Sequence, residues 1–355
     1  MDNTNTSIPS PPSGQPPSGQ PASRAWLRNT IWFLGGQTVS LFGSALVQYA
    51  IVWYITLTTK SGAMMTLSTL FGFLPQILIS LPAGVWADRY RRKWLIVGAD
   101  ALTAVTTLIL AILFFSGHGS ITAILVASAL RSIGAGIQMP AVTATLPQFV
   151  PPDRLMKVNG VNGAIQSVTM LLAPAVAGAL MASWPLETIF FIDVSTAAVA
   201  IVIIANLPLP PHAREGSVSS SQWRDLREGL RYLWDHAFLK NLIGYYFVIM
   251  FLVVPAAFLT PLMVTRSFGP EVWKLTVNEI AFSAGMTLGG FLMAAWGGFR
   301  NRIHTIAYAC MAFGVLILGM GAAPVFWLYL IVLFVTGVTL PSYNVASMTL
   351  LQEQV

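Results

Sequence analysis

Two long stretches of this chain, residues 29–59 and 61–87, contain no Asp, Glu, Lys or Arg. Each is longer than the roughly 20 apolar residues that a helix needs to cross a bilayer. After them, residues 84–93 (GVWADRYRRK) hold five charged side chains. Because charges are costly in hydrocarbon, this segment is predicted to lie in water between two membrane spans. By the positive-inside rule, that water is the cytoplasm.

The composition excludes most other classes of protein. Hydrophobic residues make up 55% of the chain and charged residues 9%, whereas charged residues are about a quarter of a soluble domain. The net charge of +6 does not indicate a nucleic-acid partner, because the cations form no stripe. Cys310 stands alone, so neither a disulfide nor a CxxC metal site is expected. The sequence contains no HExxH, no GxxxxGK[ST] and no His-rich face, so we expect no enzyme, cofactor or metal.

Hydrophobic runs between breaks of Pro, Gly and charge predict ten spans, and hence an all-α integral membrane protein. They cover approximately residues 30–57, 64–87, 94–116, 120–148, 158–183, 188–208, 238–264, 276–297, 303–322 and 325–350. The last two come from one uncharged run, residues 303–352, which is long enough for two helices. Residues 322–324 (AAP) are the predicted turn between them.

The cations predict which side of the membrane each loop faces. Of the 19 Lys and Arg residues, only Lys60, Arg266 and Lys274 fall on the side opposite to residues 84–93, and Arg131 lies within a span. This bias predicts a multi-pass protein of the cell (plasma) membrane with a cytoplasmic N-terminus. Residues 1–23 are rich in Pro, Ser, Gly and Gln and cannot bury apolar surface, so they are predicted to be a disordered cytoplasmic tail.

The longest connection divides the spans into six and four. Residues 24–208 are predicted to form an N-terminal bundle and residues 238–355 an incomplete C-terminal bundle, joined by a cytoplasmic linker at 209–237. Apolar residues recur in the linker at helical spacing: Trp223, Leu226, Leu230, Leu233 and Trp234. We expect an amphipathic helix on the membrane surface that tethers the bundles.

The two halves of the chain also echo each other. GIQMP at 136–140, in the fourth span, has the same spacing of Gly and Pro as GVTLP at 337–341, in the tenth. The segment WGGFRNR at 296–302 follows the eighth span, just as the charged segment at residues 84–93 follows the second. Internal repeats are typical of secondary transporters, so two related bundles are predicted.

The pattern GxxxDRxxRK at residues 84–93 resembles the signature loop of the major facilitator superfamily. ALRSIG at 129–134, residues 159–178 and Asp193 are similar to its drug:proton antiporter branch, typified by macrolide efflux proteins and the enterobactin exporter. The resemblance implies a major facilitator fold of two six-helix bundles, with only ten of twelve transmembrane helices present. Because the chain stops at the end of the tenth span, we expect a fragment or truncated product.

The resemblance implies a secondary active transporter that works by alternating access. The branch favours proton-coupled efflux of hydrophobic small molecules, such as macrolide-like drugs or siderophore-like compounds, and thus drug resistance. The expected partners of a monomer are a small-molecule substrate, a proton as the coupling ion and the lipid bilayer. An importer or symporter of the same fold, a non-transporting receptor or scaffold, and an inactive truncated carrier are the alternatives.

In that superfamily the signature loop is a conformational latch. The resemblance carries this role to Gly84, Asp88, Arg89, Arg92 and Lys93, and Asp153 is a candidate partner for Arg92. The carboxylate of Asp88 is expected to face the positive N-terminus of an eleventh span in the outward-facing state. The alternative is a solvated loop that only anchors the topology, which explains the cations but not Gly84 and Asp88.

Four ionisable side chains within the spans are candidates for function, because each is costly there. Arg131, near the middle of the fourth span, is either a cavity charge that couples substrate to protons or the structural partner of a nearby carboxylate. Asp100, Asp193 and Glu279 are candidate proton carriers. For Asp193 and Glu279, snorkelling or a hydrogen bond to a span end is the alternative. Glu279 is preferred for proton coupling, because it is the only acid within a span of the second half.

A small-residue segment in the fifth span completes the candidates. LAPAVAG at 172–178 is similar to an antiporter element, with Pro174 and Gly178 at two of its positions. A bend used in alternating access and ordinary helix packing are equally good explanations. Gly285-x-x-x-Gly289 in the eighth span has the same two interpretations.

Overall fold

The computed structural model describes residues 25–208, 231, 234 and 237–354. The predicted N-terminal tail and the predicted amphipathic helix of the linker lie outside these described residues. Within them the chain is almost entirely helical, and ten helices are long and apolar enough to cross a membrane. The prediction of ten spans in an all-α protein is therefore confirmed.

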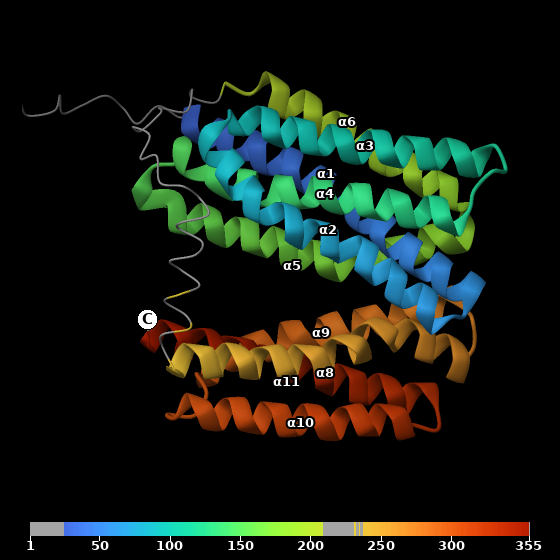
Figure 1. Ribbon diagram of the computed structural model, residues 1–355, viewed down its shortest axis with the longest axis vertical. Helices are drawn as coiled ribbons and strands as arrows, with labels where there is room; N and C mark the ends of the chain where they lie inside the picture. Colours follow the sequence, from blue (N-terminus) through green and yellow to red (C-terminus); the bar gives the residue numbers. More distant parts are fainter. Residues whose placement is uncertain (1–24, 209–230, 232–233, 235–236, 355) are drawn as a thin grey trace, which may run out of the picture.

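Apart from the segment between α6 and α8, short connections join successive helices (Figure 1). Their bounds are α1 Ala25–Thr59, α2 Gly62–Arg89, α3 Arg92–Phe115, α4 Ile121–Thr145 with a 3-10 turn at Leu146–Gln148, α5 Pro152–Ser183, α6 Leu186–Asn206, α8 Ala237–Ser267, α9 Val272–Trp296, α10 Arg302–Ala322 and α11 Phe326–Gln354. The turn predicted at residues 322–324 falls where α10 ends and α11 has not yet begun.

Local sequence explains several helix ends. The Ser61 hydroxyl accepts a hydrogen bond from the Met64 backbone nitrogen at the start of α2, and the Ser120 hydroxyl accepts one from that of Ala123 at the start of α4. These side chains satisfy donors that have no partner in the first helical turn. Gly297 ends α9 in the left-handed conformation, with φ at 74°, which glycine adopts without strain.

The helix α5 begins six residues before its predicted span. The charges of Asp153, Arg154 and Lys157 set the predicted boundary at residue 158, because charges are excluded from hydrocarbon. The backbone is nevertheless helical from Pro152, a residue that suits the first helical position. The helix therefore extends beyond the apolar span, and its charged first turn is exposed.

The echo between the two halves has a structural counterpart. α4 packs most extensively on α2 and then on α3, and α11 packs on α9 and α10 in the same way. A Cβ on Gly136 of α4 would lie 2.8 Å from the Gln76 carbonyl oxygen of α2. A Cβ on Gly337 of α11 would lie 3.0 Å from the Met286 nitrogen of α9. Both glycines thus allow equivalent helix backbones to approach closely.

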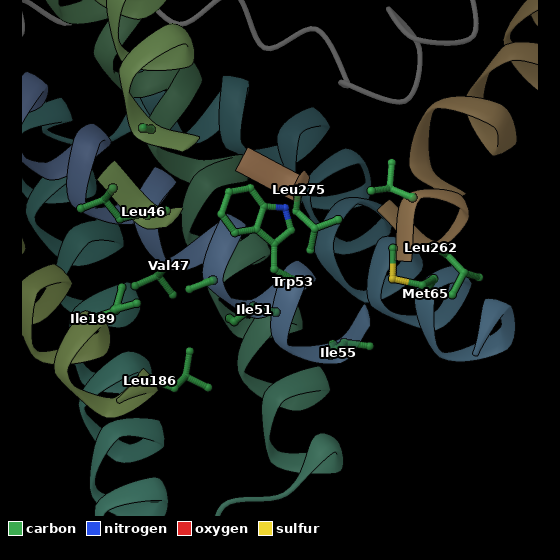
Figure 2. Close-up of a cluster of buried hydrophobic side chains, with 14 of the residues drawn as sticks. Leu46, Val47, Ile51, Trp53, Ile55, Met65, Leu186, Ile189, Leu262 and Leu275 are labelled. Carbon is green, nitrogen blue, oxygen red and sulfur yellow. The ribbon is translucent and has the colours of Figure 1, made fainter. Parts of the chain in front are cut away.

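We call the end of the molecule that carries residues 89–93 the basic end, and the opposite end the distal end. At the distal end a single hydrophobic core joins α1–α6 to α8–α11. Trp53 and Met65 belong to the same buried cluster as Leu262 of α8 and Leu275 of α9 (Figure 2). The ring centroids of Phe73 of α2 and Phe258 of α8 lie 5.2 Å apart and add to this contact.

At the basic end each group of helices has a hydrophobic core of its own. The first cluster includes Phe33, Ile96 and Ile204, all from α1–α6. The second includes Ile306 and Tyr343, from α10 and α11. Figure 1 shows the two groups as separate layers, α1–α6 above and α8–α11 below. The described cores therefore join the groups at the distal end only.

Candidate functional site

The first group of helices contains a buried ion pair between Arg131 of α4 and Asp193 of α6. The Arg131 Nη1 donates to the Asp193 Oδ2. Arg131 is 7% exposed and Asp193 is fully buried. The structure thus supplies the carboxylate partner that one of the two interpretations of Arg131 requires. The alternative for Asp193, snorkelling or a hydrogen bond to a span end, is wrong. Its carboxylate lies about 10 Å along α6 from the start of the helix and pairs with the buried Arg131.

Neutral groups complete the hydrogen bonding of this pair. The Thr107 hydroxyl donates to the Asp193 Oδ2 over 3.0 Å, and the Ser44 hydroxyl donates to the Oδ1 over 3.1 Å. The Arg131 Nη1 also donates to the Thr107 hydroxyl, and its Nη2 donates to the Ser44 carbonyl oxygen over 3.2 Å. A Cβ on Gly43 would lie 3.3 Å from the Asp193 Oδ1, so Gly43 keeps α1 close to α6. The pair therefore links α1, α3, α4 and α6.

Asp100 lies nearer the basic end, in a cluster without a cation. It is 3% exposed. Its Oδ1 accepts hydrogen bonds from the Ser40 hydroxyl over 2.8 Å and from the Gln138 Nε2 over 2.7 Å. The same Gln138 nitrogen lies 3.4 Å from the Gln37 Oε1. Residues of α1 and α4 thus surround the carboxyl of α3.

Glu279 lies where the two groups of helices meet. It is half-buried on α9 and accepts a long hydrogen bond of 3.5 Å from the Asn278 Nδ2. The Tyr329 hydroxyl of α11 donates to the Asn278 Oδ1 over 2.9 Å. The Glu279 carboxyl interacts electrostatically with Tyr329 and also with Tyr49 of α1, in the other group. This acid therefore faces the contact at the distal end.

At the basic end, Arg92 joins three helices. Its Nε donates to the Ala87 carbonyl oxygen over 2.7 Å, and its Nη1 donates to the Ala144 carbonyl oxygen at the end of α4. Its Nη2 lies 3.3 Å from the Oδ1 of Asp88, which is exposed. The expected pairing of Arg92 with Asp153 is wrong. Asp153 instead pairs with the adjacent Arg154, which is held beside it by the first turn of α5.

The other residues of the signature loop differ in their surroundings. The Lys93 Nζ donates to the Leu207 carbonyl oxygen over 2.9 Å, next to the end of α6. Arg89 is exposed at the end of α2. A Cβ on Gly84 would meet no described atom within 4 Å. Cations of this loop thus bind backbone carbonyls at helix ends, where a positive charge is favourable.

The small residues of α5 and α9 lie at two different contacts. Gly178 faces Thr276 of α9, whose Cβ would lie 2.9 Å from a Cβ added to Gly178. The contact between α5 and α9 is the most extensive one between the two groups of helices. Pro174 is buried within the continuous helix α5. Gly285 and Gly289 instead face the backbone of α11, so the packing interpretation applies to them.

The neutral partners in the first group of helices were not predicted from the sequence. Gln37, Ser40 and Ser44 lie at spacings of three and four residues on α1, which places them on one face. Their signal is a set of polar residues along one stripe of a span without charges. Such a stripe indicates that this face of α1 contacts polar groups and not lipid.

Comparison with known proteins shows the family to which the chain belongs. The family model described as Major Facilitator Superfamily matches residues 33–355. The chain is 31% identical over 329 residues to macrolide efflux protein A of Streptococcus pyogenes, covering 92% of this chain and 81% of the relative. It is 30% identical over 298 residues to macrolide efflux protein A of Enterococcus faecalis, covering 83% of this chain and 92% of the relative.

Solved structures share the fold at low sequence identity. A bacterial homologue of the iron transporter ferroportin, in an inward-facing state, superposes with a TM-score of 0.67 at 15% identity, covering 93% of this chain and 84% of the other. The nucleoside transporter NupG has a TM-score of 0.63 at 14% identity, covering 93% and 83%. This multi-pass chain, which has ten membrane-spanning helices within its described residues, belongs to the Major Facilitator Superfamily.

Proposed function

We propose that this chain exports hydrophobic small molecules by alternating access, driven by protons that move in the opposite direction. The observation that carries the proposal is the arrangement of the cores. One core joins both groups of helices at the distal end, and each group has its own core at the basic end. A carrier closed on one side and open on the other has this arrangement.

The cations indicate which side of the membrane the closed end faces. With the basic end in the cytoplasm, as the positive-inside rule requires, the distal end faces outward. The conformation is then inward-facing, ready to take substrate from the cytoplasm or the inner leaflet. The names of the macrolide efflux relatives support export and a large apolar substrate class. The chain itself is proposed to act as a transporter and not as an enzyme.

Glu279 is the residue proposed to couple protons to this cycle. Its carboxyl lies at the contact between the two groups and interacts electrostatically with Tyr49 of the other group. When the distal end opens, that contact separates and water reaches the carboxyl. The two conformations therefore offer Glu279 different solvation, which is what a group must experience to bind a proton in one state and release it in the other.

The signature loop is proposed to act as the latch of the opposite state. In the present conformation Arg92 ties the ends of α2 and α4 together. Asp88 is exposed at this end. When the basic end closes, an exposed carboxylate there is suited to meet a helix N-terminus of the other group. Asp88→Asn is expected to lower turnover without lowering the amount of folded protein.

The test is transport by the purified chain in proteoliposomes. A radiolabelled macrolide is expected to accumulate against its gradient when a proton gradient is imposed, and a protonophore is expected to abolish this accumulation. Glu279→Gln is expected to lose gradient-driven accumulation but to keep exchange of labelled for unlabelled substrate, because exchange needs no net proton movement. Glu187→Gln, an acid at the start of α6, is the matched control and is expected to retain both activities.

Three outcomes would contradict the proposal. Binding without any flux indicates a receptor or scaffold, or an inactive carrier. Flux in the direction of the imposed proton movement indicates a symporter. Proton-driven accumulation by Glu279→Gln at the wild-type rate removes Glu279 from the coupling step.

A further inference from the structure

We propose that Asp100 forms a buried proton-binding site inside the first group of helices, together with Gln37, Ser40 and Gln138. The inference rests on the proposed proton-driven transport and adds a second carboxyl to it. Unlike Glu279, this site lies within one group of helices. It is therefore not opened by a simple separation of the two groups.

The two carboxylate oxygens of Asp100 are used unequally. Oδ1 accepts the hydrogen bonds of Ser40 and Gln138, over 2.8 and 2.7 Å. Oδ2 is buried and has no hydrogen-bond partner among the residues that the structure describes. A charged carboxylate oxygen buried without a protein donor is unfavourable. A proton on Oδ2 converts that oxygen into a donor and removes the charge.

No described cation contacts Asp100. The helices that contact α3 carry few charged side chains: Arg131 on α4, Asp193 and Glu187 on α6, Arg28 at the basic end of α1, and Asp88 and Arg89 at the basic end of α2. Arg131 is already bonded to Asp193, so the single cation at mid-span neutralises the other acid. A carboxylate at 3% exposure without a counterion is unfavourable, because burial penalises its charged form. A bound proton offsets this cost where no cation does.

Gln37 provides a second buried polar atom without a hydrogen-bond partner among the described residues. Its Nε2 is buried without a partner, like the Asp100 Oδ2. Both side chains contact the same Gln138 nitrogen, so the two unsatisfied groups belong to one cluster.

Polar positions repeat every seven residues on three helices. Gln37 and Ser44 lie on α1, Asp100 and Thr107 on α3, and Gln138 and Arg131 on α4. Seven residues are about two turns, so each pair shares a face and is separated by roughly 10 Å. The proton site and the Arg131–Asp193 pair therefore form two levels of one polar column.

Through this column, the charge on Asp100 acts on the Arg131–Asp193 pair. When the proton leaves Asp100 Oδ2 for water at the basic end, a negative charge remains about two turns from the Arg131 guanidinium. Attraction between these charges in a medium of low dielectric competes with the Asp193 pair and favours another packing of α1, α3, α4 and α6. Protonation of Asp100 is thus coupled to the arrangement of the first group of helices.

Infrared difference spectroscopy of the full chain in lipid, recorded without substrate while the pH is changed, tests the site. A protonated carboxyl has a C=O stretch that shifts in D2O. Asp100→Asn is expected to lose one such band, whereas Glu279→Gln and the control Glu187→Gln are expected to retain it. Ser40→Ala is expected to keep the band but to shift its frequency, because one hydrogen bond to Oδ1 is removed. This second variant tests the assignment if Asp100→Asn does not fold.

Two results would overturn the inference. One is a set of carboxyl bands that Asp100→Asn and Ser40→Ala leave unchanged. The other is loss of the Asp100 band on addition of sodium at constant pH, which would make the position a metal-cation site. Because no substrate is present, these results are separate from the transport assay. The band can be present in a chain that does not transport, and absent in one that couples to protons through Glu279 alone.

Discussion

Removing the charge of Asp193 while keeping its shape isolates the effect of the buried pair. Asp193→Asn leaves the Arg131 guanidinium, at 7% exposure, without a counterion. The replacement amide retains the size of the carboxylate, so little cavity is created. The variant is therefore a test of electrostatics and not of packing.

The expected loss of stability depends on the hydrogen-bond acceptors that Arg131 retains. Breaking a buried pair by removing one partner typically costs about 3–5 kcal/mol. Arg131 keeps the Thr107 hydroxyl and the Ser44 carbonyl oxygen as acceptors, so the lower end, about 3 kcal/mol, applies here. This corresponds to a change of about 100-fold in the unfolding equilibrium. Arg131→Met, which leaves Asp193 charged and buried, is expected to cost a similar amount.

The assay is equilibrium unfolding in mixed micelles, with a double-mutant cycle. The double variant Arg131→Met with Asp193→Asn carries no buried charge, so it is expected to be more stable than either single variant. Glu187→Gln, on the same helix but partly exposed, is the control and is expected to change the free energy of unfolding by less than about 0.5 kcal/mol. Single variants that cost less than about 1 kcal/mol, or a double variant with purely additive costs, would refute the reasoning.

Three further predictions concern the helix ends and the close contacts. Arg92→Ala is expected to destabilise the chain by about 2 kcal/mol, because two backbone carbonyls lose a charged donor; recovery by Arg92→Lys in the same unfolding assay would contradict this. Gly289→Ala is expected to destabilise the chain through contact with the α11 backbone, whereas Gly290→Ala, which meets no described atom, is expected to stabilise it by up to about 1 kcal/mol; equal shifts would refute the close approach. A hydrogen bond from Lys274 lowers the pKa of Glu271 from its ordinary value of 4.5. The small contribution of this pair to stability is therefore present above pH 4.5 and is lost as the pH falls through the lowered pKa. Glu271→Gln is expected to remove this acid dependence of the unfolding midpoint, and an unchanged pH profile would refute the prediction.

The sequence predicted the membrane spans because the relevant signal is local. A span needs about 20 apolar residues, and runs such as residues 61–87 show it without knowledge of any neighbour. The predicted start of α5 was late, because charge marks the edge of hydrocarbon whereas the helix continues past it. Local rules therefore predict the number of spans better than the lengths of the helices.

The pairing of buried side chains depends on information that is not local. Arg131 and Asp193 are 62 residues apart, and their contact requires the rotation of α4 and α6 about their axes. The sequence identified both as costly residues within spans, and it left the partner of Arg131 open. Asp153 was matched to Arg92 from their shared end of the bundle, but adjacency in the first turn of α5 gives it Arg154 instead. A similar depth of two residues in the membrane therefore predicts an ion pair less well than the packing of their helices does.

The place of Gly178 on α5 has a mechanical consequence. Gly178 is five residues from the distal end of α5 at Ser183 and 26 residues from the basic end at Pro152, which correspond to roughly 8 and 39 Å along the helix. If the two layers rock as rigid bodies about the Gly178–Thr276 contact, α5 is a lever with arms in a ratio of about one to five. A slip of about 1 Å at the short arm then moves the long arm by about 5 Å, which is half the usual distance between the axes of packed helices. A small change in packing on one face of the membrane therefore produces a wide opening on the other.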